Sequence, residues 1–131
     1  MSAVVVGYVP SAEGRAALDR GIVEARLRRL PLVVVNATRG DSLVDERYVQ
    51  GDAVATLQAE LDGLDIDAQL RQLNEGGDIA DELDDVATEL GAELIVIGLR
   101  RRSPVGKLIL GSAASRILLT AKHPILTVKP A

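Results

Sequence analysis

The residue types best suited to chemistry gather in one segment, residues 98–112. In a chain whose formal net charge is −4, this segment carries four cationic side chains, Arg100, Arg101, Arg102 and Lys107. The pair Gly111-Ser112 closes it and precedes a predicted helix, whose first backbone N–H groups have no partner within the helix. Guanidinium groups, free N–H groups and hydroxyls are the donors that bind phosphate in proteins. The segment therefore predicts a phosphate site.

Each of these signals has a simpler interpretation when taken alone. A glycine before a serine is a common way to begin a helix, and arginines on a loop are usually solvated surface. The convergence of these features after one hydrophobic strand favours a site. A P-loop is excluded, because seven residues rather than four separate Gly98 from Gly106 and because Leu108 replaces the required hydroxyl residue.

Other polar residues give weaker signals. His123 is the only histidine, so no histidine pair or catalytic triad exists, and its place before Pro124 is typical of a cap or loop residue. The spacing of Asp41, Asp45 and Glu46 matches no defined metal-binding loop. The acidic stretch 75–93 is interpreted as a solvated helix face, with a surface for a basic partner as the alternative.

The amino-acid composition argues against several classes of protein function. A chain of 131 residues with 47% hydrophobic residues can bury its own core, and we expect one domain over residues 1–131. The acidic charge and an aromatic content of 2% argue against nucleic-acid binding, which needs cations and stacking surfaces. Cysteine is absent, which excludes disulfides and thiolate sites. No apolar run approaches the roughly 20 residues of a membrane span, and no leader is recognisable, so we expect a cytoplasmic protein without membrane contact.

Hydrophobic periodicity predicts alternating strands and helices. Short runs that are apolar on both faces indicate buried parallel strands, and apolar residues three or four apart indicate amphipathic helices. Strands are predicted at 3–9, 32–35, 66–71, 94–97 and 124–129, and helices at 12–28, 49–63, 78–91 and 112–121. Ser11, Asp78 and Ser112 are the predicted N-caps. A long irregular loop is expected after Gly98.

This succession predicts an α/β fold with a doubly wound, five-stranded parallel sheet and helices on both faces. The third strand alternates apolar and polar residues and is therefore placed at an edge, in the strand order 3-2-1-4-5. Ligands of such sheets bind beyond the carboxyl ends of the strands. Residues 98–112 begin at one of those ends.

The chain resembles the universal stress protein family over essentially its whole length. The resemblance rests on residues 92–98 leading into the glycine loop, on Gly111-Ser112, and on the closing strand 124–129. The ATP-binding branch of that family has the pattern Gly, two residues, Gly, nine residues, Gly, then Ser or Thr. Here the same spacing gives Gly98, Arg101, Gly111 and Ser112, with arginine in place of the second glycine.

The resemblance implies a Rossmann-like, adenine nucleotide alpha hydrolase-like fold that binds ATP or AMP, with or without Mg²⁺, and is at most a weak ATPase. Phosphates would lie on Gly111, Ser112 and Ala113, beneath Leu99–Arg102. The remaining expected ligand contacts are Val9 and Pro10 around the base or ribose, the backbone of Val35 at the adenine, and Gly98, Arg100, Arg101, Gly106 and Lys107 in the loop.

The resemblance also implies a homodimer joined through Ile125 to Val128 and a further, unidentified protein partner. Nucleotide-binding members usually carry an Asp near the end of the first strand, where this chain has Gly7-Tyr8-Val9-Pro10. This departure and Arg101 keep an alternative open, in which the domain has lost nucleotide binding and acts as a dimeric interaction module. An enzyme of the related nucleotide-hydrolase architecture is a third class, but no nucleophile or paired base accompanies the loop.

Overall fold

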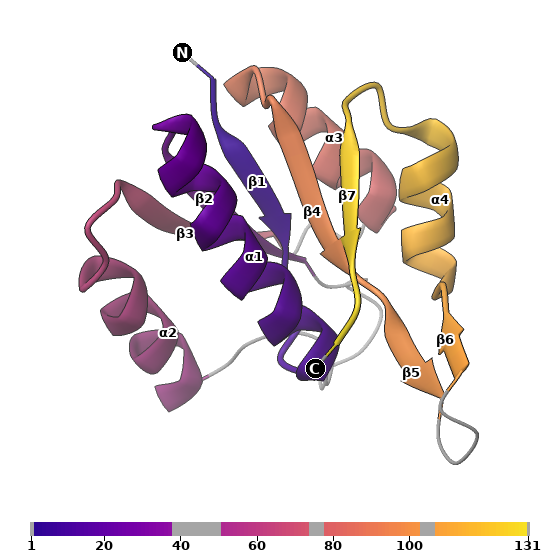
Figure 1. Ribbon diagram of the computed structural model, residues 1–131, viewed down its shortest axis with the longest axis horizontal. Coiled ribbons are helices and arrows are strands. Elements are labelled where there is room, and N and C mark those ends of the chain that lie inside the picture. Colours follow the sequence, from indigo (N-terminus) through magenta and orange to yellow (C-terminus); the bar gives the residue numbers. More distant parts are fainter. Residues whose placement is uncertain (1, 38–50, 74–77, 103–106, 131) are drawn as a thin grey trace.

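The computed structural model describes residues 2–37, 51–73, 78–102 and 107–130. Strands and helices alternate along the chain, and a small hairpin is inserted before the last helix (Figure 1). The elements are β1 (Val4–Gly7), α1 (Ala12–Arg28), β2 (Leu32–Ala37), α2 (Asp52–Asp62), β3 (Ala68–Leu73), α3 (Ile79–Leu90), β4 (Leu94–Gly98), β5 (Arg100–Arg102), β6 (Lys107–Ile109), α4 (Ser112–Thr120) and β7 (Ile125–Val128).

The main sheet has five parallel strands in the order β3-β2-β1-β4-β7. Because β7 is the fifth of the predicted strands, the predicted order 3-2-1-4-5 and the edge position of the third strand are both confirmed. The direction of strand succession reverses at β1, which pairs with β2 on one side and with β4 on the other.

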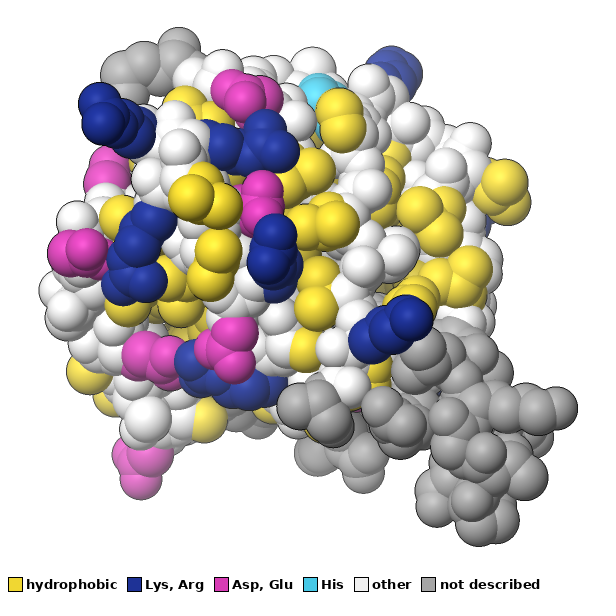
Figure 2. All heavy atoms as spheres, in the orientation of Figure 1, with side chains coloured by type: hydrophobic (Ala, Val, Ile, Leu, Met, Phe, Trp, Pro, Cys, Tyr) yellow, Lys and Arg dark blue, Asp and Glu magenta, His cyan; other side chains and the backbone are white. Residues whose placement is uncertain are grey.

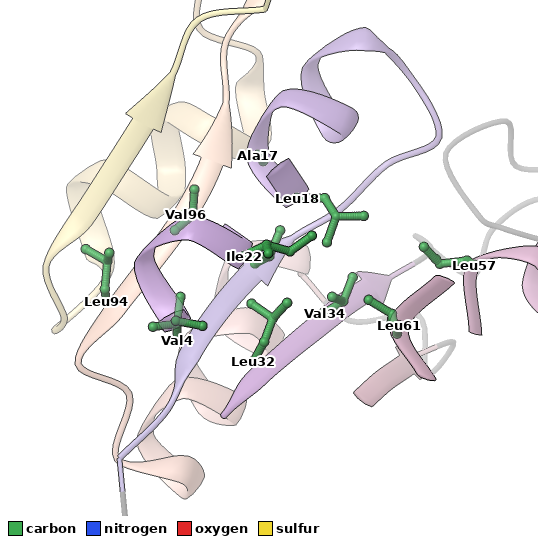
Figure 3. Close-up of a cluster of buried hydrophobic side chains, with 12 residues drawn as sticks. Val4, Ala17, Leu18, Ile22, Leu32, Val34, Leu57, Leu61, Leu94 and Val96 are labelled. Atoms are coloured by element: carbon green, nitrogen blue, oxygen red, sulfur yellow. The ribbon is translucent and has the colours of Figure 1, made fainter. Parts of the chain in front are cut away.

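Alternate residues of the central strands face two separate cores, because successive side chains of a strand point to opposite faces. One core packs Val4 and Val6 against α1 and α2, and the other packs Val5 against α3 and α4. Figure 3 shows the first of these, where Leu18 and Ile22 of α1 meet the strands. The sheet is thus covered on both faces.

Three helix ends follow from the residues found there. The Ser11 side chain accepts from the Gly14 N–H at 3.3 Å, and the Asp78 carboxylate accepts from the Ala80 N–H at 2.8 Å, so both predicted caps are confirmed. Gly91 ends α3 with φ of 61°, a conformation that glycine adopts without strain.

Two predictions about the elements are wrong in detail. Gly51, predicted inside the second helix, instead precedes it as the N-cap with φ of 59°, so α2 begins at Asp52 and buries Leu57 and Leu61. The segment after Gly98 is not wholly irregular, because β5 and β6 pair as antiparallel strands. Arg101 lies opposite Leu108 in that hairpin, and Arg102 lies opposite Lys107.

Candidate functional site

The carboxyl ends of β1 and β4 lie side by side in the sheet, and α1 begins next to both. A side chain on Gly98 would place its Cβ 2.1 Å from the Glu13 carbonyl oxygen, and one on Gly14 would lie 1.7 Å from the Val9 carbonyl oxygen. Both distances are far below van der Waals contact. Glycine at these two positions therefore lets the first turn of α1 lie directly on the ends of β1 and β4.

Arg100 connects the beginnings of two helices. Its Nε atom lies 3.3 Å from Oε2 of Glu13, in the first turn of α1. Its Cδ atom lies 3.4 Å from the position that a Cβ on Gly111 would occupy, and its Nη1 lies 3.8 Å from that position. The predicted phosphate ligand Arg100 is therefore at the start of α4, but it is already paired with a carboxylate.

The start of α4 differs from the prediction by one residue. Gly111, not Ser112, is the N-cap, and no side chain caps the helix. The Ser115 N–H donates to the Gly111 carbonyl at 2.9 Å, so the N–H groups of Ser112, Ala113 and Ala114 precede the first helical hydrogen bond. These groups form the positive end of the α4 dipole.

Gly111 is glycine at a place where neither conformation nor packing requires it. Its φ of −67° and ψ of 166° are accessible to any residue. Among the residues that the structure describes, the nearest atoms to a Cβ there belong to the flexible Arg100 side chain, at a normal contact distance. The missing side chain leaves the start of α4 open to close approach.

The predicted base-binding residues lie at the ends of β1 and β2. Val9 is partly buried and Pro10 is exposed, directly before α1. The backbone of Val35 is expected to contact an adenine, and its carbonyl accepts the Tyr8 N–H at 2.9 Å, so this oxygen already has a partner in the sheet. Val9, Pro10 and Val35 are brought to the same edge of the sheet as Gly98 and Gly111.

Asn36 is a buried polar residue at this edge that the sequence analysis did not single out. Its side chain is inaccessible to solvent; Nδ2 donates to the Tyr8 carbonyl at 2.9 Å, and Oδ1 accepts from Gln72 at 3.3 Å. These bonds fix the backbone of Tyr8 just before Val9 and Pro10. The available signal was a polar residue at the end of an otherwise apolar strand.

Tyr8 itself points toward α1 and α2 and packs against the core on that face. Burial raises the pKa of the Tyr8 hydroxyl, while nearby Arg15 opposes the rise and Glu60 adds to it. The phenol therefore stays neutral well above neutral pH. Its ring packs against the core just before Val9 and Pro10, two of the predicted base-binding residues.

The weaker candidates take structural positions. His123 Nδ1 lies 3.1 Å from Oδ1 of Asp84, and the same oxygen accepts the Lys122 N–H, which ties the turn before β7 to α3. This turn lies at the amino end of β7, whereas Gly98 lies at the carboxyl end of β4. Asp81, Asp85 and Glu89 of α3 are exposed, whereas Glu82 and Asp84 are partly buried. The N-cap Asp78 pairs with Arg116, and Glu89 pairs with Arg71.

Several predicted residues lie where less is defined. Arg101 and Lys107 belong to β5 and β6 by their backbone, whereas Gly106 and the carboxylates Asp41, Asp45 and Glu46 lie outside the described residues. Within the described ranges, no group of three or more acidic or imidazole side chains is arranged to hold a metal ion. None of the described helices combines the length and the apolar character that crossing a bilayer demands.

Comparison with known proteins bears on the family and the fold. The sequence model of the universal stress protein family matches residues 1–129. A universal stress protein of Mycolicibacterium smegmatis is 45% identical over 127 residues, which cover 97% of each chain.

Two solved structures of universal stress proteins from Archaeoglobus fulgidus are similar over 98% of both chains. One is 32% identical with a TM-score of 0.79. The other, solved in complex with dAMP, is 25% identical with a TM-score of 0.74. The agreement in sequence and in fold extends over the full sheet and its helices, and the chain belongs to the universal stress protein family.

Proposed function

We propose that this chain is an adenine-nucleotide-binding module of the stress response, with ATP or AMP at the carboxyl edge of the sheet. The phosphates would lie on the first N–H groups of α4, at Gly111, Ser112 and Ala113. The base and ribose would lie toward Val9, Pro10 and the end of β2 at Val35. The proposed role is regulatory binding rather than turnover, with at most slow ATP hydrolysis.

The observation that carries the proposal is the unexplained glycine at position 111. Packing accounts for Gly98, but neither packing nor backbone conformation accounts for Gly111. A ligand that approaches the backbone closely would account for it, because a side chain there would cover the free N–H groups. The similar Archaeoglobus fulgidus structure in complex with dAMP supports an adenine nucleotide as that ligand.

The hairpin would supply the remaining contacts. Gly98 positions the chain as it leaves β4, and Arg100 lies over the start of α4. Arg101, Gly106 and Lys107 belong to the segment that would enclose the phosphates. Mg²⁺, where present, would be carried by phosphate oxygens, because the nearby Glu13 carboxylate is occupied by Arg100.

A second function has a specific observation in its favour. Arg101 replaces the motif glycine, and Arg100 already has a carboxylate partner, so two of the three arginines in the hairpin's first strand differ from a free phosphate site. In this alternative, the domain no longer binds nucleotide and contacts protein partners as a dimer.

Native mass spectrometry of freshly purified protein, followed by calorimetric titration with ATP and AMP, separates the two functions. Gly111→Val should abolish binding by covering the start of α4, whereas Lys107→Ala should weaken it about ten- to a hundredfold, the effect of losing a charge-assisted contact. Arg101→Gly restores the family pattern. If neither the wild type nor this variant binds adenine nucleotide, the interaction-module function stands instead.

A further inference from the structure

Glu13 is held in a fixed place beside the proposed phosphate site. Its backbone lies against Gly98, where even a Cβ atom would not fit. Its carboxylate forms an ion pair with Arg100, and the Glu13 side chain is only 21% exposed. The same arginine reaches the start of α4, so a single guanidinium group separates the Glu13 carboxylate from Gly111.

This position has two electrostatic consequences for an incoming phosphate. The positive charge of Arg100 is largely compensated before any ligand arrives. In addition, the negative charge of Glu13 repels each further negative charge on the ligand, and the separation is short enough that salt screens it only in part. Both effects grow with the number of phosphate charges.

We propose that Glu13 is a specificity residue that makes this site select against highly charged phosphate chains. This inference rests on the proposed function. The site then prefers AMP to ATP more strongly than the helix N-terminus and the cationic side chains alone would produce. A triphosphate forms an ion pair with Arg100 only if the guanidinium group leaves the Glu13 carboxylate. Glu13 acts through Arg100 and through its own charge, without contacting the nucleotide.

The decisive variant is Glu13→Gln, which keeps the size of the side chain and removes its charge. Each added phosphate charge is disfavoured about threefold by one carboxylate at such separations. The variant should therefore bind ATP about tenfold more tightly relative to AMP than the wild type does. Titrations without Mg²⁺, at 20 and 300 mM NaCl, measure this ratio, which should shift less at the higher salt.

A matched control is Glu89→Gln. It also removes a helical carboxylate paired with an arginine, Arg71, but it lies in the last turn of α3, away from the edge where β4 ends. This variant should leave the ATP-to-AMP ratio unchanged. Arg100→Gln should weaken ATP binding severalfold in both backgrounds, because in the wild type it leaves the Glu13 carboxylate uncompensated and in Glu13→Gln it removes the released guanidinium.

Inorganic tripolyphosphate separates this inference from the proposed adenine ligand. A gain in tripolyphosphate affinity for Glu13→Gln, together with no ATP binding by any variant, would retain the role of Glu13 and overturn the adenine nucleotide. Unchanged or weaker tripolyphosphate binding would overturn the role of Glu13 whatever ATP does. Glu13→Ser, which suits a first helical turn, replaces Glu13→Gln if the latter fails to fold.

Discussion

At the scale of single residues, glycine serves two different purposes along one motif. Gly98 is required by packing, because the backbone of Glu13 occupies the space of its side chain. Gly111 has space for a side chain and an unstrained conformation. Motif spacing identified both residues, but only the structure separates the glycine that packing requires from the glycine that leaves the start of α4 without a side chain.

This difference predicts opposite results for two alanine variants. Gly98→Ala forces a Cβ into the Glu13 carbonyl, 2.1 Å away, and should lower the free energy of unfolding by about 3 kcal/mol. Gly111→Ala should change it by less than about 1 kcal/mol, because a weaker N-cap is offset by a less flexible unfolded chain. Urea denaturation of both variants measures this, and equal losses would refute the distinction.

Glu13 and Asn36 show what sequence reasoning about the site could not reach. Nothing in the sequence marks Glu13 among the acidic residues, since its importance comes from two segments that meet it in space, Gly98 and Arg100. Asn36 owes its role to Tyr8 and Gln72 on neighbouring strands. Motifs record spacing along the chain, whereas these contacts depend on the order of strands in the sheet.

At the scale of elements, hydrophobic periodicity predicted those helices and strands whose positions are determined by the burial of apolar side chains. The helices α1 and α3 and the central strands were predicted closely, because each has a clear apolar pattern and, for the helices, a recognisable cap. The hairpin β5–β6 was missed because its strands are only three residues long and β5 consists entirely of arginine, so neither strand carries such a pattern. The start of α2 was misplaced because the apolar repeat was extended back through Gly51. Gly51 has a positive φ and lies just before the first residue of the helix.

The helix α2 is joined to α1 by an ion pair as well as by its buried leucines. Arg15 Nη1 donates to Oε1 of Glu60 at 2.8 Å, and this contact holds the pKa of the Glu60 carboxyl below its ordinary value of 4.5. A carboxyl with a lowered folded-state pKa stabilises the fold above its unfolded pKa. That stabilisation is lost as the pH falls through the folded-state value.

Glu60→Gln should therefore lower the free energy of unfolding by at most about 1 kcal/mol at pH 7, since both side chains are partly solvated. The difference from the wild type should shrink progressively as the pH falls below about 4.5 and vanish in stronger acid. Urea midpoints between pH 7 and pH 3 test this. Asp62→Asn, on the same helix, removes a carboxylate that accepts from Gln58 and should show no such loss. A pH-independent effect of Glu60→Gln would contradict the assignment.

At the scale of the whole molecule, the predicted sheet order drew on one edge signal in the sequence, and the structure confirms it. The mixed polarity of the third strand placed it at one edge, and β7 closes the other.

Among the described strands, β7 pairs only with β4. It carries no charged residue, and its side chains are only partly buried. Figure 2 shows hydrophobic side chains gathered over β7 and the adjacent α4, where Leu118 and Leu119 are exposed. An apolar edge strand of this kind invites pairing with another chain.

We propose that two copies pair through β7, and hydrogen-bond alternation identifies a variant that tests this. The carbonyls of Pro124 and Val128 accept N–H groups of β4, so the N–H and carbonyl groups of Ile125 and Thr127 face the open edge. Thr127→Pro removes one outward donor while leaving the bonds to β4 intact.

The wild type should sediment as a dimer at micromolar concentration, and Thr127→Pro should sediment as a monomer with little change in its own unfolding free energy. Thr127→Val keeps both the N–H and the β-branched shape and should remain dimeric. A monomeric wild type would refute the pairing. A Thr127→Pro variant as dimeric as the wild type would place the contact elsewhere, with the exposed leucines of α4 as the next surface to substitute.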